Sequence, residues 1–72
     1  MQKVFVQLRE PLRSVSGEIL SVYGYASYGN RLVGLFSEDR IHWIEIPYAN
    51  ILCIHNIGIG QEPEKCAQCL TL

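Results

Sequence analysis

The chain has 72 residues, which is enough for one small domain with a marginal hydrophobic core. Hydrophobic residues make up 49% of the sequence, a share that argues against a disordered chain. The net charge of −1, with only 6 lysines and arginines scattered along the chain, argues against strong non-specific binding to nucleic acids.

Three cysteines are an odd number, which fits a disulfide framework poorly and a reducing compartment better. Residues 1–10 lack the apolar run and the cleavage site of a signal peptide. No apolar run approaches the ~20 residues that span a bilayer. We therefore expect a cytoplasmic protein with no membrane contact.

Apolar and polar residues alternate with a period of two along most of the chain, and this pattern predicts strands. The predicted strands cover residues 3–9, 15–25, 31–36, 41–46 and 51–57. A bend at Pro11 separates the first two strands, and Gly17 predicts a bulge or a sharp bend. Residues 37–40 predict a charged turn, and residues 47–50 predict a tight connector that a single 3₁₀ turn would satisfy.

Five short strands with tight connections predict an all-β fold, a small five-stranded and strongly bent barrel of the SH3 or Sm type. The barrel would occupy residues 1–57, and a C-terminal tail with a Cys-x-x-Cys motif would occupy residues 58–72. No serine, histidine and acid set, phosphate loop or carboxylate pair is recognisable in the sequence. We therefore predict no catalytic residues, no small-molecule substrate and no enzymatic activity.

Two stretches of the sequence resemble the Sm-like family (Sm, LSm and Hfq proteins). The first motif of that family runs from a glycine through an apolar strand to an aromatic residue two before an asparagine, then to another apolar strand. The matching residues are Gly17, Ile19, Tyr28, Asn30 and Leu32. The second motif, an apolar strand, a tight turn and Ile-x-x-Ile, is matched by "IEIPYAN" followed by Ile51 and Ile54. The chain is thus similar to a divergent bacterial or phage-type member, and the resemblance implies a bent barrel that assembles into a ring.

The nucleotide pocket of the family is matched only in part. There, the aromatic residue, the asparagine and an arginine form the pocket, and here Tyr28 and Asn30 match the first two. The family's acidic residue is replaced by Ala26, and its Arg-Gly pair is replaced by Pro47-Tyr48. The longer spacing from the motif's glycine predicts an insertion in the loop "YGYASYGN". By this resemblance we predict Tyr28 and Asn30, with Tyr48 from the second motif, as nucleic-acid-binding residues.

The stretch "YGYASYGN" supports two interpretations. In one, Tyr28 stacks on a base and Asn30 hydrogen-bonds the base edge, because stacking on an aromatic side chain contributes about 1–3 kcal/mol per base. In the other, the stretch is a hairpin loop whose tyrosines cover the end of the barrel and keep their hydroxyls in water. No basic cluster lies beside the loop in the sequence.

The cysteines and a histidine indicate a second candidate site. Cys53 and His55 are two apart on a predicted strand and point to the same face, and Cys66 and Cys69 form a Cys-x-x-Cys half-site. Together they offer four soft ligands for tetrahedral zinc, which would also stabilise a domain this small. The alternative is that Cys53 is a small buried apolar residue, His55 is a surface residue and the tail is disordered.

The fourth and fifth predicted strands are apolar on both faces, and a monomeric barrel of this size cannot bury both. Pairing of these strands between identical subunits, in a symmetric ring, would cover them. The predicted interface residues are Ile41, Trp43, Ile51 and Ile54. The alternative is that the tail covers one edge and leaves a monomer or a dimer.

These observations leave three hypotheses for the function. The first is a homo-oligomeric Sm-like module that binds single-stranded RNA through the loop of Tyr28 and Asn30. The second is a structural or protein-interaction ring without nucleic-acid binding. The third is a small zinc-stapled domain.

Overall fold

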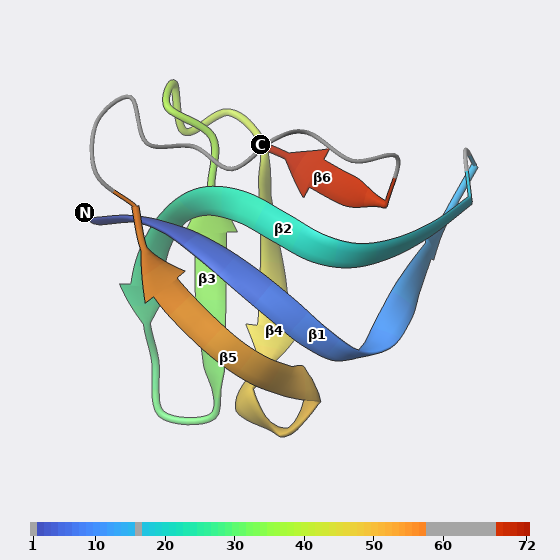
Figure 1. The fold of residues 1–72 in the computed structure, drawn as a ribbon. Helices are drawn as coiled ribbons and strands as arrows, with labels where there is room; N and C mark the ends of the chain where they lie inside the picture. Colours follow the sequence, from blue (N-terminus) through green and yellow to red (C-terminus); the bar gives the residue numbers. More distant parts are fainter. Residues whose placement is uncertain (1, 16, 58–67) are drawn as a thin grey trace.

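The computed structural model describes residues 2–15, 17–57 and 68–72, and these residues form one sheet (Figure 1). The elements in chain order are β1 (Gln2–Ser14), β2 (Gly17–Tyr28), β3 (Leu32–Phe36), β4 (Trp43–Pro47), the 3₁₀ turn η1 (Tyr48–Asn50), β5 (Ile51–Asn56) and β6 (Cys69–Thr71). The strand order is β4-β3-β2-β1-β5, with β6 off this path beside β2. The predicted all-β class and the 3₁₀ turn are confirmed.

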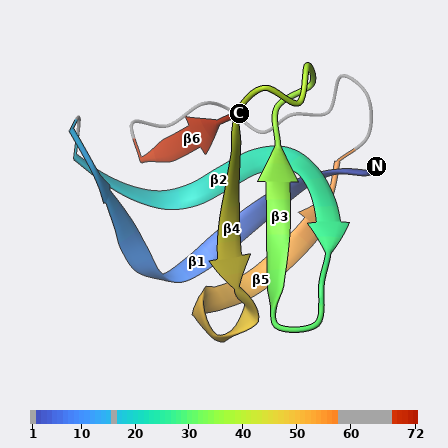
Figure 2. The same cartoon turned by 180° about the vertical axis from the view of Figure 1, so that it is seen from behind.

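The sheet is bent into two layers but is not closed within one chain. Figure 1 shows β1 and β5 in front of β3 and β4, and Figure 2 shows the reverse, with the long curved β2 joining the two layers. In the described part of the chain, β4 pairs only with β3 and β5 pairs only with β1. A closed barrel is therefore not observed, and assembly into a ring stays a prediction.

The core lies between the two layers. Along β1, Val4, Val6 and Leu8 point inward, as the period-two pattern predicts. The buried core residues that the structure describes come from β1 to β5: Val4, Val6, Leu8, Val22, Ala26, Val33, Leu35, Ile46 and Ile51. Each buried side chain of the valine or leucine size stabilises the fold by about 1.5–3 kcal/mol, so this cluster holds the layers together.

One edge of β2 is shared between two strands. Residues 21–23 pair with β6 in parallel, and residues 25–28 pair with β3 in antiparallel fashion. Gly24 lies between the two segments, and a Cβ atom there would be 3.2 Å from the Leu35 Cβ and 3.3 Å from the Leu72 Cδ1. The absence of a side chain at Gly24 therefore lets β3 and the C-terminus approach β2 together.

The end of the chain belongs to the sheet, which the sequence analysis did not predict. Leu70 and Leu72, within the predicted tail, pack against the core. Three residues are too few to show a strand period, and the pairing of β6 with β2 depends on contacts distant in sequence. The rest of the predicted tail, residues 58–67, lies outside the described residues.

β1 is longer than predicted. The bend expected at Pro11 is a break in the register with β2 between Gln7 and Leu12, and the strand continues beyond it. Beside this break, the Asn50 side chain takes the place of a strand neighbour. Its Oδ1 accepts a hydrogen bond from the Glu10 N–H at 2.8 Å, and its Nδ2 donates to the Glu10 carbonyl at 3.2 Å. Past the break, the hairpin of β1 and β2 projects from the body of the molecule (Figure 1).

β2 is also longer than predicted, at its C-terminal end. Tyr28 pairs with Val33 of β3, so the loop between the two strands shrinks to residues 29–31. The extra length expected in the loop "YGYASYGN" is therefore extra strand. Gly17, predicted to bend the strand from within, is its first residue and has a φ of 127°, a conformation that glycine adopts at no steric cost.

Candidate functional site

Tyr48 ties the β2–β3 loop to the turn after β4. The Tyr48 hydroxyl donates a hydrogen bond to the Gly29 carbonyl at 2.9 Å, and its backbone N–H donates to the Arg31 carbonyl at 3.1 Å. The Gly29 N–H donates to the Leu32 carbonyl at 2.9 Å and closes the loop. Figure 1 shows the loop and η1 side by side at the lower end of the molecule. The structure thus brings Tyr28, Asn30 and Tyr48 to the same end of the molecule.

The side chains of this end have different exposures. Tyr28 is 57% exposed, and Asn30 and Arg31 are exposed beside it. Tyr48 is half-buried against the core, and its hydroxyl hydrogen is used by Gly29, so it positions the loop. Chemically, the loop offers an aromatic ring for stacking, an amide for hydrogen bonds to a base edge and a guanidinium for a phosphate.

One residue of this loop was not predicted, and two positions where the sequence departs from the family's pocket contribute little to the loop. Arg31 was not assigned, although it directly follows Asn30 in the first motif. Ala26, at the place of the family's acidic residue, is buried in the core. Pro47, at the place of the family's arginine, is exposed at the end of β4 and offers no charge.

The two end strands of the sheet expose apolar side chains. Ile41 and Trp43, just before and at the start of β4, are 66% and 56% exposed, and Leu52 on β5 is 57% exposed. Trp43 stacks on Phe36 of the neighbouring β3, with ring centroids 6.4 Å apart. Unpaired backbone edges beside exposed apolar side chains are surfaces that favour pairing with another chain.

The other two predicted interface residues face inward. Ile51 is buried in the core, and Ile54 packs against the core. Strict alternation would place them on opposite faces, but β5 shifts register against β1 here, and Leu52 is the extra residue that turns outward. Leu52 is therefore the apolar side chain that β5 exposes.

A groove lies between the start of β4 and the C-terminal end of β6. It has a volume of about 550 Å³ and is lined by Ile41, His42, Trp43, Ile44, Leu70, Thr71 and Leu72. This mostly apolar lining suits apolar side chains better than a polar ligand. The groove is not predictable from the sequence, because one of its walls is the unpredicted strand β6.

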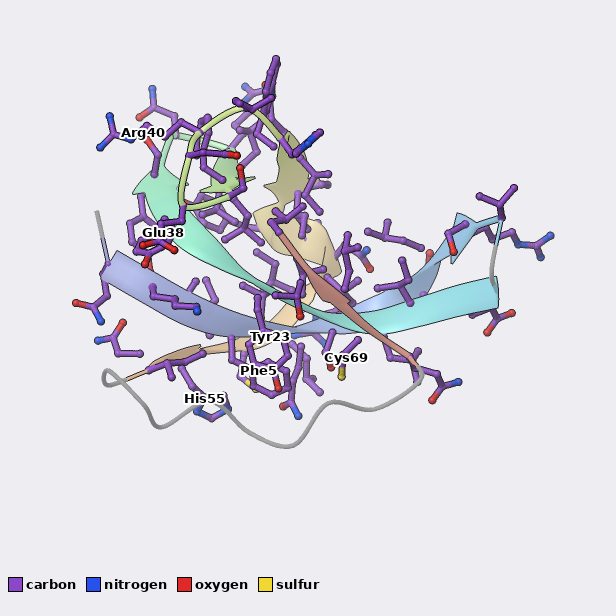
Figure 3. The ribbon with its side chains drawn as sticks, turned by 90° about the horizontal axis from the view of Figure 1, so that it is seen from above. Phe5, Tyr23, Glu38, Arg40, His55 and Cys69 are labelled. Carbon is purple, nitrogen blue, oxygen red and sulfur yellow. The ribbon has the colours of Figure 1, made fainter. Side chains whose placement is uncertain are left out.

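The three predicted zinc ligands that the structure describes, Cys53, His55 and Cys69, are not gathered around one point. Cys53 and His55 share a face, with the Cys53 Sγ 3.2 Å from the His55 Nε2. Cys69 lies on the same side of the sheet (Figure 3), but β1 and β2 separate its strand from β5. Three strand spacings of about 4.8 Å each exceed the spread of side chains around one zinc ion.

Cysteine chemistry also differs from the expectation of a reduced chain. Cys69 is engaged in a disulfide, which the odd cysteine count did not predict. Cys66 lies outside the described residues. Among the residues that the structure describes, no three histidine, cysteine, aspartate or glutamate side chains are grouped as metal ligands. Zinc binding therefore stays a prediction.

The turn between β3 and β4 brings Ser37, Asp39 and His42 together as a structural network. The Ser37 hydroxyl donates to the Asp39 carboxylate, the Ile41 N–H donates to the same carboxylate at 3.0 Å, and the His42 N–H donates to the Ser37 Oγ at 3.1 Å. The bond from Ser37, followed by the bond from Ile41, lowers the pKa of Asp39 below its ordinary value of 3.8. The serine hydrogen points to a carboxylate, so the group stabilises a turn and is not a nucleophile–base pair.

Comparison of the chain with protein-family models, with curated proteins and with solved structures finds no match. The Sm-like resemblance therefore rests on the two sequence motifs and stays a prediction. No helix in the described ranges is long and apolar enough to cross a membrane.

Proposed function

We propose that the protein is a non-enzymatic, self-assembling β-module whose copies pair through β4 and β5 to form a ring. One observation carries the proposal: among the described residues, β4 and β5 each have one unpaired edge, and both expose apolar side chains, Trp43 at β4 and Leu52 at β5. Pairing β4 of one copy with β5 of the next would cover both ends at once. Such a head-to-tail contact repeats from copy to copy until a ring closes.

The assembly is tested by native mass spectrometry of the full chain, which counts the subunits directly. Leu52→Lys places a charge on the β5 end, and we expect it to convert the oligomer into monomers. Val15→Lys is the matched control, because Val15 is a fully exposed apolar residue at the tip of the projecting hairpin, away from both end strands. A monomeric wild type, or equal assembly of the Leu52→Lys variant, would contradict the proposal.

The second part of the proposal is that the loop of Tyr28 and Asn30 binds single-stranded RNA. It is supported by the exposed ring of Tyr28, by Arg31 beside it and by the tether from Tyr48 that holds the loop in place. A ring would present identical loops around one axis, so individually weak contacts to successive bases would add along one strand.

RNA binding is tested by fluorescence anisotropy with short single strands at low and physiological salt. Each stacked base contributes about 1–3 kcal/mol, so we expect Tyr28→Ala to weaken binding about 5-fold to 150-fold and Tyr28→Phe to retain it. Arg31→Ala is expected to reduce the salt dependence, since it removes one phosphate contact. Binding that Tyr28→Ala leaves unchanged, or no binding by an intact ring, would favour the alternative of a structural or protein-interaction ring.

A further inference from the structure

The edge of β2 along residues 20–24, here called the β6-binding edge, holds β6 in parallel through main-chain hydrogen bonds (Figure 1). The Gln68 carbonyl, just before β6, accepts a hydrogen bond from the Leu20 N–H at 2.8 Å. Just after β6, the Leu72 N–H donates to the Tyr23 carbonyl at 3.1 Å. Bonds at both ends therefore fix the register of a segment that lies on this edge.

Two leucines of the segment 68–72 add side-chain contacts on the core side of this edge. Leu70 and Leu72 are two residues apart in an extended segment, so they point to the same face, and both pack against the core. The Leu72 Cδ1 lies 3.3 Å from the position of a Cβ atom at Gly24, so the absence of a side chain at Gly24 leaves room for it. The edge thus binds a Leu-x-Leu segment by main-chain bonds and by alternate apolar side chains, as in other cases of strand addition to a sheet.

The contact between β6 and the rest of the sheet is short. β6 has three residues, and in the described part of the chain it pairs with β2 alone. Its pairing is parallel, which is slightly less stable per residue than the antiparallel pairing of β1 with β2 and of β2 with β3. Leu70 and Leu72 are only partly buried. A segment with few bonds and partly buried side chains opens more readily than the centre of a sheet, so β6 is held much as a short peptide would be.

We propose that copies of this chain exchange their β6 strands, so that the segment 68–72 of one copy occupies the β6-binding edge of another. A second copy offers the identical segment, so every bond and contact made within one chain can also form between two. By its number of residues, the connection from Ile57 to Gln68 can span up to about 35 Å, more than the largest extent of the molecule, 29 Å. The segment can therefore reach the same edge on a copy that touches its own.

The β6 strand of the same copy competes with that of a second copy. A tether of this length keeps the segment at an effective concentration on the order of millimolar. At micromolar chain concentrations β6 therefore stays on its own copy, and at about 1 mM the two arrangements become comparable. Native mass spectrometry at micromolar concentration thus reports pairing through β4 and β5, which are other strands than β2. The exchange does not depend on the ring proposed above.

The first test measures whether the β6-binding edge accepts the segment from a separate molecule. The full chain with Leu70→Ser and Leu72→Ser keeps the edge but loses both leucines, and its Tm should be lower than that of wild type. The probe is the peptide Gln-Ser-Leu-Thr-Leu, which carries residues 68–72 with serine in place of Cys69. At about ten times its Kd, this peptide should raise the Tm of the variant by about 5–10 °C, because it binds the folded chain. The control peptide Gln-Ser-Ser-Thr-Ser should leave the Tm unchanged.

The second test detects exchange between copies of the full chain. A photo-reactive benzoylphenylalanine replaces Thr71, which is exposed and lies opposite Tyr23 of β2. This chain is mixed with isotopically labelled wild type, and mass spectrometry shows whether residue 71 is cross-linked to β2 of its own copy or of a labelled copy. We expect links within one copy at about 10 μM, and a comparable share between copies at about 1 mM. The same group at Val15, a fully exposed residue at the tip of the projecting hairpin, is the matched control for random encounters.

Two results would overturn the proposal. One is an equal effect of the two peptides on the Tm, which would show that the edge does not bind the segment from a separate molecule. The other is that mixed-isotope links to β2 at about 1 mM are absent, or are as frequent from position 15 as from position 71. If circular dichroism shows that the double variant is unfolded, Leu72→Ser alone replaces it in the peptide test. The cross-linking test needs neither substitution.

Discussion

Gly24 allows a direct test of how β2 is shared between β3 and β6. In a Gly24→Ala variant the new Cβ would lie 3.2 Å from both the Leu35 Cβ and the Phe36 carbonyl oxygen, and 3.3 Å from the Leu72 Cδ1. Ordinary contacts of a Cβ atom are 3.4–4 Å. The first two neighbours are fixed to the backbone of β3 and cannot rotate away. β3 must therefore move away from β2 by a few tenths of an ångström to accept the methyl group.

The expected loss of stability follows from two opposing effects. Overpacking a tightly packed site costs about 1–3 kcal/mol, and the reduced freedom of the unfolded chain offsets about 0.4–1 kcal/mol of this. We expect Gly24→Ala to lower the free energy of unfolding by about 1–2 kcal/mol. In a domain of this length 1 kcal/mol corresponds to about 4–8 °C, so Tm should fall by about 5–15 °C.

Gly34→Ala is the matched control for the substitution at Gly24. Gly34 is also a buried strand glycine, and the nearest atom to its new Cβ is the Phe36 Cε1 at 3.0 Å, the far end of a ring that can rotate. Its loss of stability should therefore be smaller. Urea unfolding gives both free energies, because a single domain of this size unfolds in one cooperative step. A Gly24→Ala variant as stable as wild type, or more stable than Gly34→Ala, would refute the packing argument.

Three other substitutions test the bonds that position the loops. Tyr48→Phe removes the hydroxyl that donates to the Gly29 carbonyl, and it should lower the free energy of unfolding by at most about 1 kcal/mol. We also expect weaker RNA binding in the anisotropy assay, and an unchanged affinity would contradict the role of Tyr48 in holding the loop. Asn50→Ala removes both bonds to the Glu10 backbone and should cost about 1–2 kcal/mol in urea unfolding, and a neutral result would contradict its role at the β1 bend. The pKa of Asp39 in the folded state is below the ordinary value of 3.8. The Asp39 carboxylate therefore contributes its full stabilisation above pH 3.8, and this contribution is lost as the pH falls through the lowered pKa of the folded state. Asp39→Asn should therefore lose less Tm on acidification below pH 3.8 than wild type, and parallel losses would contradict this.

The sequence predicts well where a residue's environment depends on its near neighbours. The inward positions of Val4 and Val6 follow from the alternation of apolar and polar residues along the strand. The 3₁₀ turn after Pro47 follows from the small number of residues between the two predicted strands. Prediction fails where register depends on a distant partner. Leu52 turns outward because β5 shifts against β1, and no local pattern contains that shift. The pairing of Cys53 with Gln7 has the same origin.

The resemblance to Sm-like proteins predicted a long loop between the second and third strands, and the structure shows a loop of only residues 29–31 there. Alternation would have continued β2 through Tyr28, yet the glycines of "YGYASYGN" favoured a loop. Gly24 instead marks the point where one neighbour of β2 replaces another, a role that only the strand order reveals. A glycine within an apparent strand can thus indicate either a turn or the close approach of another segment. Continued alternation of apolar and polar residues around the glycine favours the close approach.

The three-residue turn η1 links the two proposed activities of the molecule. It joins β4 to β5 without any further residue, so the two end strands of the sheet meet there. The same turn holds the β2–β3 loop through two hydrogen bonds from Tyr48, one of them from its backbone. A partner that pairs with β4 or β5 would therefore bind a strand directly joined to η1, the turn that holds the loop beside Tyr28. Subunit pairing and RNA contact, if both occur, would thus both involve this one three-residue connection.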